Sequence, residues 1–220
     1  MTITEIEFSF KARYYKLGEV GKSTSQVWFV LHGYGQLAQF FVQKFQALTG
    51  HNICVIAPEG LSRFYLDELQ ASGRKNKRVG ATWMTRENRE MDIINYVRYL
   101  EAIYRAEKIE RNMSVTVLGF SQGAATACRW LMNKQARFNR LILWAGVFPP
   151  DMAFDEGNVV LRDKEILFVH GDKDPFLTPE RVEEMQTLTH RLHARVKTIE
   201  FDGGHDLDEA VLLALAGGQS

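Results

Sequence analysis

The sequence predicts an α/β fold in three layers, with a mainly parallel central sheet and helices on both of its faces. Two observations lead to this fold class: short apolar runs without polar alternation, and stretches of helical periodicity between them. A strand that is buried on both faces reads as a continuous apolar run, whereas a half-exposed strand alternates. Because the two kinds of segment follow one another along the chain, the strands are expected to pair in parallel.

The elements can be assigned in order. The strands of the sheet are expected at 26–31, 52–57, 114–118, 140–144, 165–170 and 196–201. The helices are expected at 37–48, 88–107, 122–133, 179–192 and 207–215. Residues 3–17 alternate between apolar and polar residues, which predicts one or two exposed strands before the first buried one.

A single domain covering residues 1–220 is the organisation that this length favours. The segment from about 58 to 87 lacks periodicity, and we expect it to be irregular and to form a lid or a rim. It contains a basic cluster at 74–78. This cluster has two interpretations, a solvated loop or a binding feature for an anionic group.

Composition and charge narrow the class of protein. The chain has 27 basic and 27 acidic residues, which gives no global attraction to nucleic acid or to an anionic membrane. No apolar run reaches the ~18–20 residues of a membrane span, so no stable membrane insertion is expected. The N-terminus has no secretory signal pattern. Cys54 and Cys128 lie within apolar patterns and are expected to be buried thiols, which indicates the cytoplasm. An oligomeric state is not predicted.

One motif carries candidate chemistry. Residues 119–123 read GFSQG and fit the G-x-S-x-G pattern, at a point where an apolar strand is followed by a helix of small residues. At such a strand–turn–helix junction the serine is raised above the end of the strand, where it can act as a nucleophile. The alternative is that Ser121 only caps the following helix.

A nucleophilic serine needs a base and an acid that orients the base. In strand–turn–helix hydrolases these follow in the order serine, acid, histidine. His205 lies in a glycine loop after the last expected strand, which makes it the candidate base. The preceding strand is followed by two aspartates, of which Asp174 is the favoured acid and Asp172, a possible turn residue, the second candidate. No third ligand clusters with them, so a metal site is not expected.

The oxyanion formed during acyl transfer requires backbone N–H donors. One is expected from Gln122, the residue after the serine, and the other from the loop 31–35, which follows an earlier strand. His32 is interpreted as bracing this loop. Apolar residues of the irregular segment either line an acyl pocket or simply pack that segment: Phe64, Tyr65, Trp83 and Met84.

Taken in order, "HGYG" at 32–35, "GFSQG", "HGDKDP" at 170–175 and "GGH" at 203–205 resemble the α/β-hydrolases. The closest resemblance, over about residues 26–217, is to the small carboxylesterase and phospholipase branch that includes acyl-protein thioesterases. This resemblance implies a Ser121–Asp174–His205 triad and an oxyanion hole formed by the N–H groups of Tyr34 and Gln122. It also implies that no metal and no cofactor take part.

The expected activity is therefore hydrolysis of small carboxylic esters through an acyl-enzyme, with small or medium acyl chains. The sequence departs from the thioesterase pattern in two places, one of which changes the rim of the site, while the other, the 58–87 segment, favours a small esterase over an enzyme of lipidated proteins. Tyr34 stands where thioesterases usually carry leucine, and the 58–87 segment does not match. The alternatives are a thioesterase or lysophospholipase that uses the same triad, and a non-catalytic binding protein on this fold.

Overall fold

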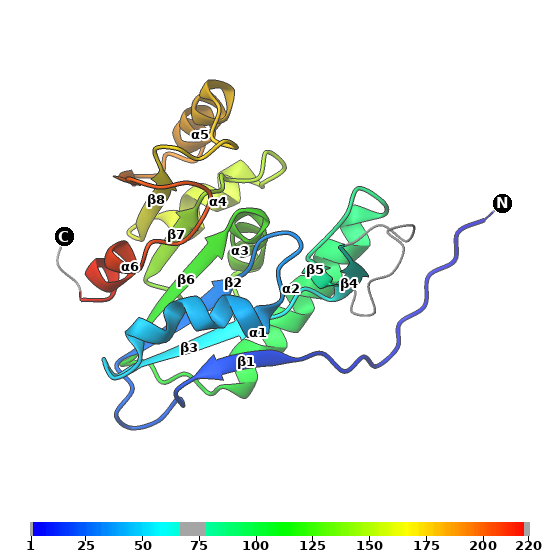
Figure 1. Ribbon diagram of the computed structural model, residues 1–220. Coiled ribbons are helices and arrows are strands. Elements are labelled where there is room, and N and C mark those ends of the chain that lie inside the picture. The colour runs from blue at the N-terminus through cyan, green and yellow to red at the C-terminus, as the bar shows by residue number, and fades with distance from the viewer. Residues whose placement is uncertain (1, 67–77, 218–220) are drawn as a thin grey trace.

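The computed structural model describes residues 2–66 and 78–217. A seven-stranded sheet runs through the centre of the molecule in the order β1-β3-β2-β6-β7-β8-β9 (Figure 1). Its strands are β1 (Tyr14–Leu17), β2 (Gln26–Leu31), β3 (Ile53–Pro58), β6 (Ser114–Phe120), β7 (Arg140–Trp144), β8 (Glu165–Gly171) and β9 (Val196–Phe201). All neighbouring pairs are parallel except β1 with β3. The predicted α/β fold with a mainly parallel sheet is confirmed.

Helices cover both faces of this sheet. They are α1 (Ala38–Phe41) with the 3₁₀ helix η1 (Val42–Leu48), α2 (Arg89–Ala106), α3 (Gln122–Met132), α4 (Phe154–Leu161), α5 (Pro179–Arg191) and α6 (Glu209–Ala216). Two separate clusters of buried apolar residues lie between the layers. One joins the sheet to α2, α3, α4 and α5, and the other joins it to α1, η1 and α6. The three-layer arrangement follows from these two cores.

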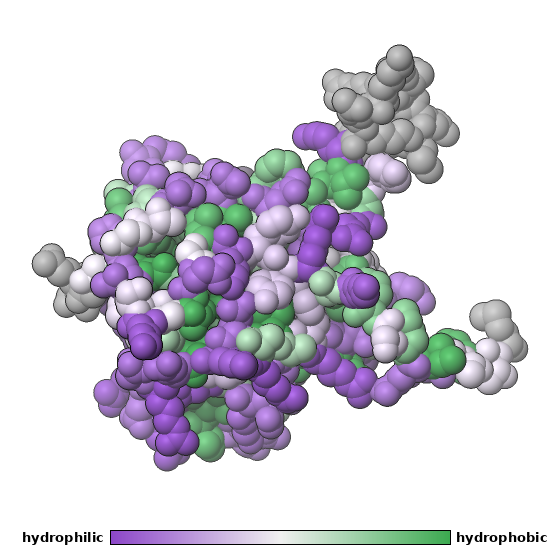
Figure 2. Space-filling model, turned by 90° about the horizontal axis from the view of Figure 1, so that it is seen from below, coloured by the Kyte–Doolittle hydropathy of each residue, from purple (hydrophilic) through white to green (hydrophobic). Residues whose placement is uncertain are grey.

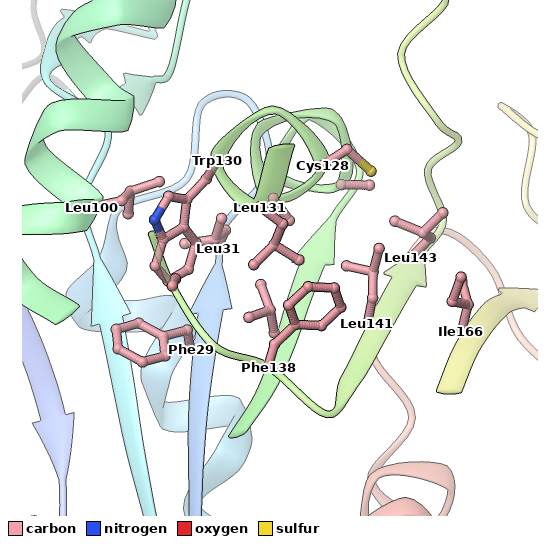
Figure 3. Packing of buried hydrophobic residues seen from close by; sticks show 14 of the residues in the cluster. Phe29, Leu31, Leu100, Cys128, Trp130, Leu131, Phe138, Leu141, Leu143 and Ile166 are labelled. Carbon is pink, nitrogen blue, oxygen red and sulfur yellow. The ribbon is translucent and has the colours of Figure 1, made fainter. Parts of the chain in front are cut away.

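The first core shows why the strands read as continuous apolar runs. Side chains from β2 and β7 meet those of α2 and α3 on one face of the sheet (Figure 3). Trp130 of α3 packs edge-to-face on Phe29 of β2, with ring centroids 5.1 Å apart. The other residues of each strand point to the opposite face and enter the second core, as Trp28 and Val30 do. Both faces of a strand are therefore apolar.

The two cysteines are free and buried, as predicted. Burial raises the pKa of Cys54 to about 11 and that of Cys128 to about 12, so both remain neutral thiols. Among the described residues, no helix is long and apolar enough to cross a membrane.

Two parts of the chain differ from expectation. The 58–87 segment contains a small antiparallel sheet, β4 (Ser62–Tyr65) with β5 (Val79–Thr82), so it is not simply irregular. Helix α4 was not predicted, because its eight residues include Gly157 and give only a short periodic pattern. Of the one or two strands expected in residues 3–17, the structure has one, β1, and residues 2–13 form an exposed segment without regular pairing. Of the basic cluster, residues 74–77 lie outside the described residues.

Candidate active site

Ser121 lies at a sharp turn between β6 and α3. Its φ of 53° and ψ of −116° place a non-glycine residue in a left-handed region, a conformation that costs about 1–3 kcal/mol and occurs mainly at functional sites. The Ser121 N–H donates to the carbonyl of Trp144, 2.8 Å away, which fixes the turn against β7. The side chain makes no capping hydrogen bond to α3, so the helix-cap interpretation is not supported.

Glycines allow the backbone segments around this turn to approach closely. A Cβ on Gly119 would lie 2.3 Å from the carbonyl oxygen of Gly123, and one on Gly123 would lie 2.2 Å from that of Leu31. Neither backbone group can move aside, because each belongs to a regular element. The two glycines of the motif are therefore required for α3 to begin directly above the ends of β6 and β2.

His205 and Asp174 are joined by a short hydrogen bond. Nδ1 of His205 lies 2.7 Å from Oδ2 of Asp174, whose side chain is only 1% exposed. The other carboxylate oxygen, Oδ1, accepts the N–H of Phe176 at 2.9 Å. The His205 ring contacts the rings of Phe120 and Phe176, at centroid distances of 4.9 and 4.7 Å. The imidazole is thus held by one charged partner and two apolar ones.

Asp172 has a different position. Its Oδ1 accepts the N–H of Gly203 at 3.0 Å, and two backbone hydrogen bonds run between the same loops, from Asp172 N–H to Phe201 and from Lys173 N–H to Gly203. Asp172 therefore ties the loop after β8 to the loop that carries His205. Asp172 thus accepts an N–H from a distant loop rather than from its own turn, and Asp174 is the aspartate that contacts the histidine.

One cavity of about 690 Å³ is lined by Ser121, Asp174 and His205 together. Its walls come from the loops after β2, β6, β7, β8 and β9, at the carboxyl ends of the parallel strands, where α/β proteins place their ligands. The apolar lining includes Tyr34, Met84, Phe120, Val147, Phe148, Pro149, Pro150, Phe176 and Leu177. Two arginines, Arg129 and Arg181, also line it. The cavity can therefore accept an apolar group next to Ser121 and His205.

The N–H groups expected to form the oxyanion hole are unused. Among the described residues, no protein acceptor is bonded to the N–H of Tyr34 or to that of Gln122, and both residues line the cavity. The Tyr34 loop is held in place by Gln36, whose Oε1 accepts the N–H of Gly33 at 2.8 Å. It is also fixed to β5, because the Gly35 N–H donates to the carbonyl of Ala81.

His32 is fully buried beside this loop. Its Nδ1 lies 2.8 Å from the carbonyl oxygen of Gly33, and its Nε2 accepts the N–H of Gly60 at 2.9 Å. The ring stacks on Trp83 at 4.9 Å. Burial lowers the pKa of His32 to about 4, so the ring is neutral near pH 7 and can keep both bonds. These contacts agree with the expected bracing role.

The Gln122 side chain has a role that the sequence did not reveal. Its Oε1 accepts from the hydroxyl of Thr82 at 3.0 Å and from the N–H of Trp83 at 3.2 Å, while its Nε2 donates to the carbonyl of Met84 at 3.0 Å. Gln122 therefore fastens the segment after β5 to the start of α3. The partners lie about 40 residues away in the sequence, so no local pattern could indicate this contact.

Of the four residues expected to line an acyl pocket, only Met84 does so. Trp83 is 1% exposed, and its indole N–H donates to the carbonyl of His32 at 2.8 Å, so it belongs to the core beneath the loop. Phe64 packs on the ring of Tyr34 at 5.1 Å, and Tyr65 is exposed; both lie outside the cavity lining. The assignment of these three to the pocket is corrected, because Trp83 is buried in the core, Phe64 packs on Tyr34 and Tyr65 is exposed.

Arg129 was not singled out from the sequence. Its side chain is 11% exposed, and its guanidinium bonds to both carboxylate oxygens of Asp151, at 2.7 and 3.3 Å. Burial lowers the pKa of Arg129, but the hydrogen bonds to Asp151 and the electrostatic influence of Tyr96 and Asp151 outweigh burial and raise it overall. Asp151 thereby holds the guanidinium of Arg129 beside Met84 in the cavity lining. In the described part of the chain, no group of three or more histidine, cysteine, aspartate or glutamate side chains could hold a metal ion.

Comparison with solved structures identifies the fold class of this chain. The acyl-protein thioesterase 2 of Zea mays superposes with a TM-score of 0.68 at 16% identity, over 94% of this chain and 99% of that one. A carboxylesterase from Mesorhizobium loti gives 0.69 at 18% identity, over 93% and 94%, and the Bacillus cereus carboxylesterase gives 0.65 at 17%, over 94% and 92%. The fold is that of the α/β-hydrolases.

The family follows from the sequence itself. The serine hydrolase FSH1 family matches residues 23–207, a range that includes all three residues of the Ser121, Asp174 and His205 arrangement. This chain belongs to that family and is a serine hydrolase. A comparison with curated protein sequences finds no match.

Proposed function

We propose that this serine hydrolase cleaves carboxylic esters through an acyl-enzyme on Ser121. The observation that carries the proposal is the strained Ser121 at the strand–helix turn, which shares one cavity with the hydrogen-bonded pair of His205 and Asp174. A hydrolase with this arrangement uses the serine hydroxyl as nucleophile, the histidine as proton carrier and the aspartate as the group that orients the histidine.

In the proposed reaction, His205 takes the proton of the Ser121 hydroxyl as the oxygen attacks the acyl carbonyl. The N–H groups of Tyr34 and Gln122 stabilise the negative charge that forms on the carbonyl oxygen; one such donor typically contributes 10²–10³-fold in turnover. His205 then gives its proton to the leaving alcohol and afterwards activates a water molecule, which releases the acid. Asp174 stays ionised and stabilises the imidazolium.

The substrate proposed is a small-molecule ester with a small or medium acyl chain. The mostly apolar lining of a cavity of about 690 Å³ supports an apolar acyl group. A thioester could enter the same site, since the steps do not depend on the leaving group. Rates on matched ester and thioester substrates of equal acyl length decide between the two. We also place the enzyme in the cytoplasm, which its two free, buried thiols support.

The test is hydrolysis of p-nitrophenyl esters by the wild-type protein, Ser121→Ala and Ser114→Ala. Ser114 is an exposed serine at the other end of the same strand, so its variant controls for the loss of a hydroxyl from β6. Ser121→Ala is expected to lose activity to the background rate, while Ser114→Ala keeps the wild-type rate. Undiminished hydrolysis by a folded Ser121→Ala protein would refute the proposal.

A further inference from the structure

The segment that precedes β1 carries large apolar side chains that are exposed to solvent. Residues 5–13, called the N-terminal arm here, are exposed throughout and project away from the body of the molecule (Figures 1 and 2). Ile6, Phe8 and Phe10 are 86%, 77% and 57% exposed. Figure 2 shows hydrophobic residues along this projecting segment. Large apolar side chains gathered on one exposed segment usually mark an interaction surface.

The arm has the sequence of a strand that lacks a partner. Apolar and polar residues alternate without a break: one face carries Ile6, Phe8, Phe10 and Ala12, and the other carries Glu5, Glu7, Ser9, Lys11 and Arg13. Such a period of two is typical of a half-buried strand. The arm continues directly into β1, which is the last strand at its edge of the sheet among the described residues. An edge strand exposes N–H and C=O groups that can pair with another chain.

The charges of the arm match those of a second arm running in the opposite direction. If two copies pair antiparallel about Ser9, residue numbers that face each other add up to eighteen. Glu5 then faces Arg13, and Glu7 faces Lys11. On the other face, Phe8 lies opposite Phe10. Because the arrangement is two-fold symmetric, every pair occurs twice. A register shifted by two residues would place Glu7 against Ser9 or Arg13 and would leave other charges unmatched.

The same register continues into the folded body. Residues 2–4 of one copy fall beside Tyr14, Tyr15 and Lys16 of the other, so that the end of each arm adds to the outer edge of the partner's β1. Apolar side chains exposed in one copy then meet across the two strands, and the backbone groups of β1 find partners.

We propose that the N-terminal arm pairs with the same arm of a second copy of this chain, which joins two molecules through an antiparallel ribbon centred on Ser9. The contacts of the arm in a single copy are compatible with this. Glu7 forms an ion pair with Arg98 at 2.7 Å, but the side chains are 84% and 64% exposed, and such pairs contribute little. Arg13 is bound to Glu59 through Nε, and its guanidinium has further donors to offer Glu5.

The experiment uses charge exchange at Glu7 and Lys11 in the full chain. Mass is measured by sedimentation equilibrium over micromolar to submillimolar concentrations for the wild type, Glu7→Lys, Lys11→Glu and the double variant Glu7→Lys/Lys11→Glu. The wild type is expected to pass from 25.2 kDa to twice that mass as concentration rises. Each single variant places two like pairs across the ribbon and should raise the dissociation constant about tenfold or more.

The double variant restores opposite charges at both pairs and should associate as the wild type does. An equimolar mixture of the two single variants should also recover, because each arm then meets one of opposite charge. A wild type that stays at 25.2 kDa at every concentration would overturn the proposal. So would single variants that associate as strongly as the wild type. The arm does not line the cavity, so ester hydrolysis and the thermal midpoint verify that all variants are folded.

Discussion

The buried carboxylate of Asp174 lies 2.7 Å from Nδ1 of His205, whereas the carboxylate of Asp172, two residues earlier, bonds to the backbone of Gly203. Two neighbouring aspartates on one loop thus have separate roles. One is placed to orient the proposed base, and the other joins the two loops that carry the pair.

This division predicts different results for the two Asp→Asn variants. An asparagine at position 174 can donate to the imidazole and favour the wrong tautomer, and the comparable change in a serine–histidine–aspartate triad lowers kcat about 10⁴-fold. We expect Asp174→Asn to lower kcat by about 10³–10⁴-fold. Asp172→Asn keeps an oxygen that can accept the Gly203 N–H, so its kcat should fall less than about tenfold. Steady-state kinetics on one ester checks both, and equal losses would contradict the assignment.

A substitution at Gln122 tests the role of its side chain separately from that of its backbone N–H. Gln122→Ala leaves the Trp83 N–H without its acceptor and removes one of the two donors to the Met84 carbonyl, which keeps the hydroxyl of Thr82; the expected cost is about 1–3 kcal/mol in the free energy of unfolding. The backbone donor remains, so kcat should fall far less than in Ser121→Ala. Gln46→Ala is the control, because Gln46 is exposed, and it should stay within about 0.5 kcal/mol of the wild type. Urea denaturation measures both variants, and equal stabilities would refute the fastening role.

Replacing Gly123, the second glycine of the motif, by alanine should lower the free energy of unfolding, although alanine has the higher helix propensity. Alanine is favoured over glycine inside a helix by about 1 kcal/mol, but a Cβ on Gly123 would lie 2.2 Å from a backbone oxygen. Overpacking of this kind costs about 1–3 kcal/mol or more, so Gly123→Ala should be destabilised overall. Gly21→Ala, where a Cβ meets nothing within 4 Å, should be nearly neutral. A Gly123→Ala protein as stable as Gly21→Ala would contradict the packing described.

Burial of His32 predicts how stability depends on pH. Its pKa is about 4 in the folded protein and near 6.5 in the unfolded chain, so only the unfolded state takes up the proton between these values. Stability contributed at this site is therefore intact above pH 6.5 and decreases as pH falls toward 4, by about 3 kcal/mol in total. The free energy of unfolding of wild type and His32→Gln, measured from pH 7 to 4.5, should show a shallower decline for the variant. Parallel curves would show that His32 is not the source.

Much of the fold could be predicted because its central strands, such as β2, β3 and β6, are largely buried on both faces. The run that became β6 is mostly apolar and leads directly into "GFSQG", which indicated the place of the turn. The order of Ser121, Asp174 and His205 along the chain likewise indicated that they would meet, since the ends of parallel strands share one edge.

The rest depended on contacts that the local sequence does not encode. Trp83 reads as a pocket residue in an aperiodic segment, but β4 and β5 place it beneath His32. The hydrogen bonds of the Gln122 side chain and the ion pair of Arg129 with Asp151 join residues that are 22 to 40 positions apart. The alternation of residues 3–17 predicted one or two strands but not their length, and among the described residues only Tyr14–Leu17 pairs, with β3.

The central claim is that Ser121 is the nucleophile, and covalent labelling tests it most directly. Wild-type protein treated with a fluorophosphonate and analysed by intact and peptide mass spectrometry should carry one adduct per chain, located on Ser121. Ser121→Ala should carry none under the same conditions. An adduct on another residue, or no adduct on the folded wild type, would contradict the account.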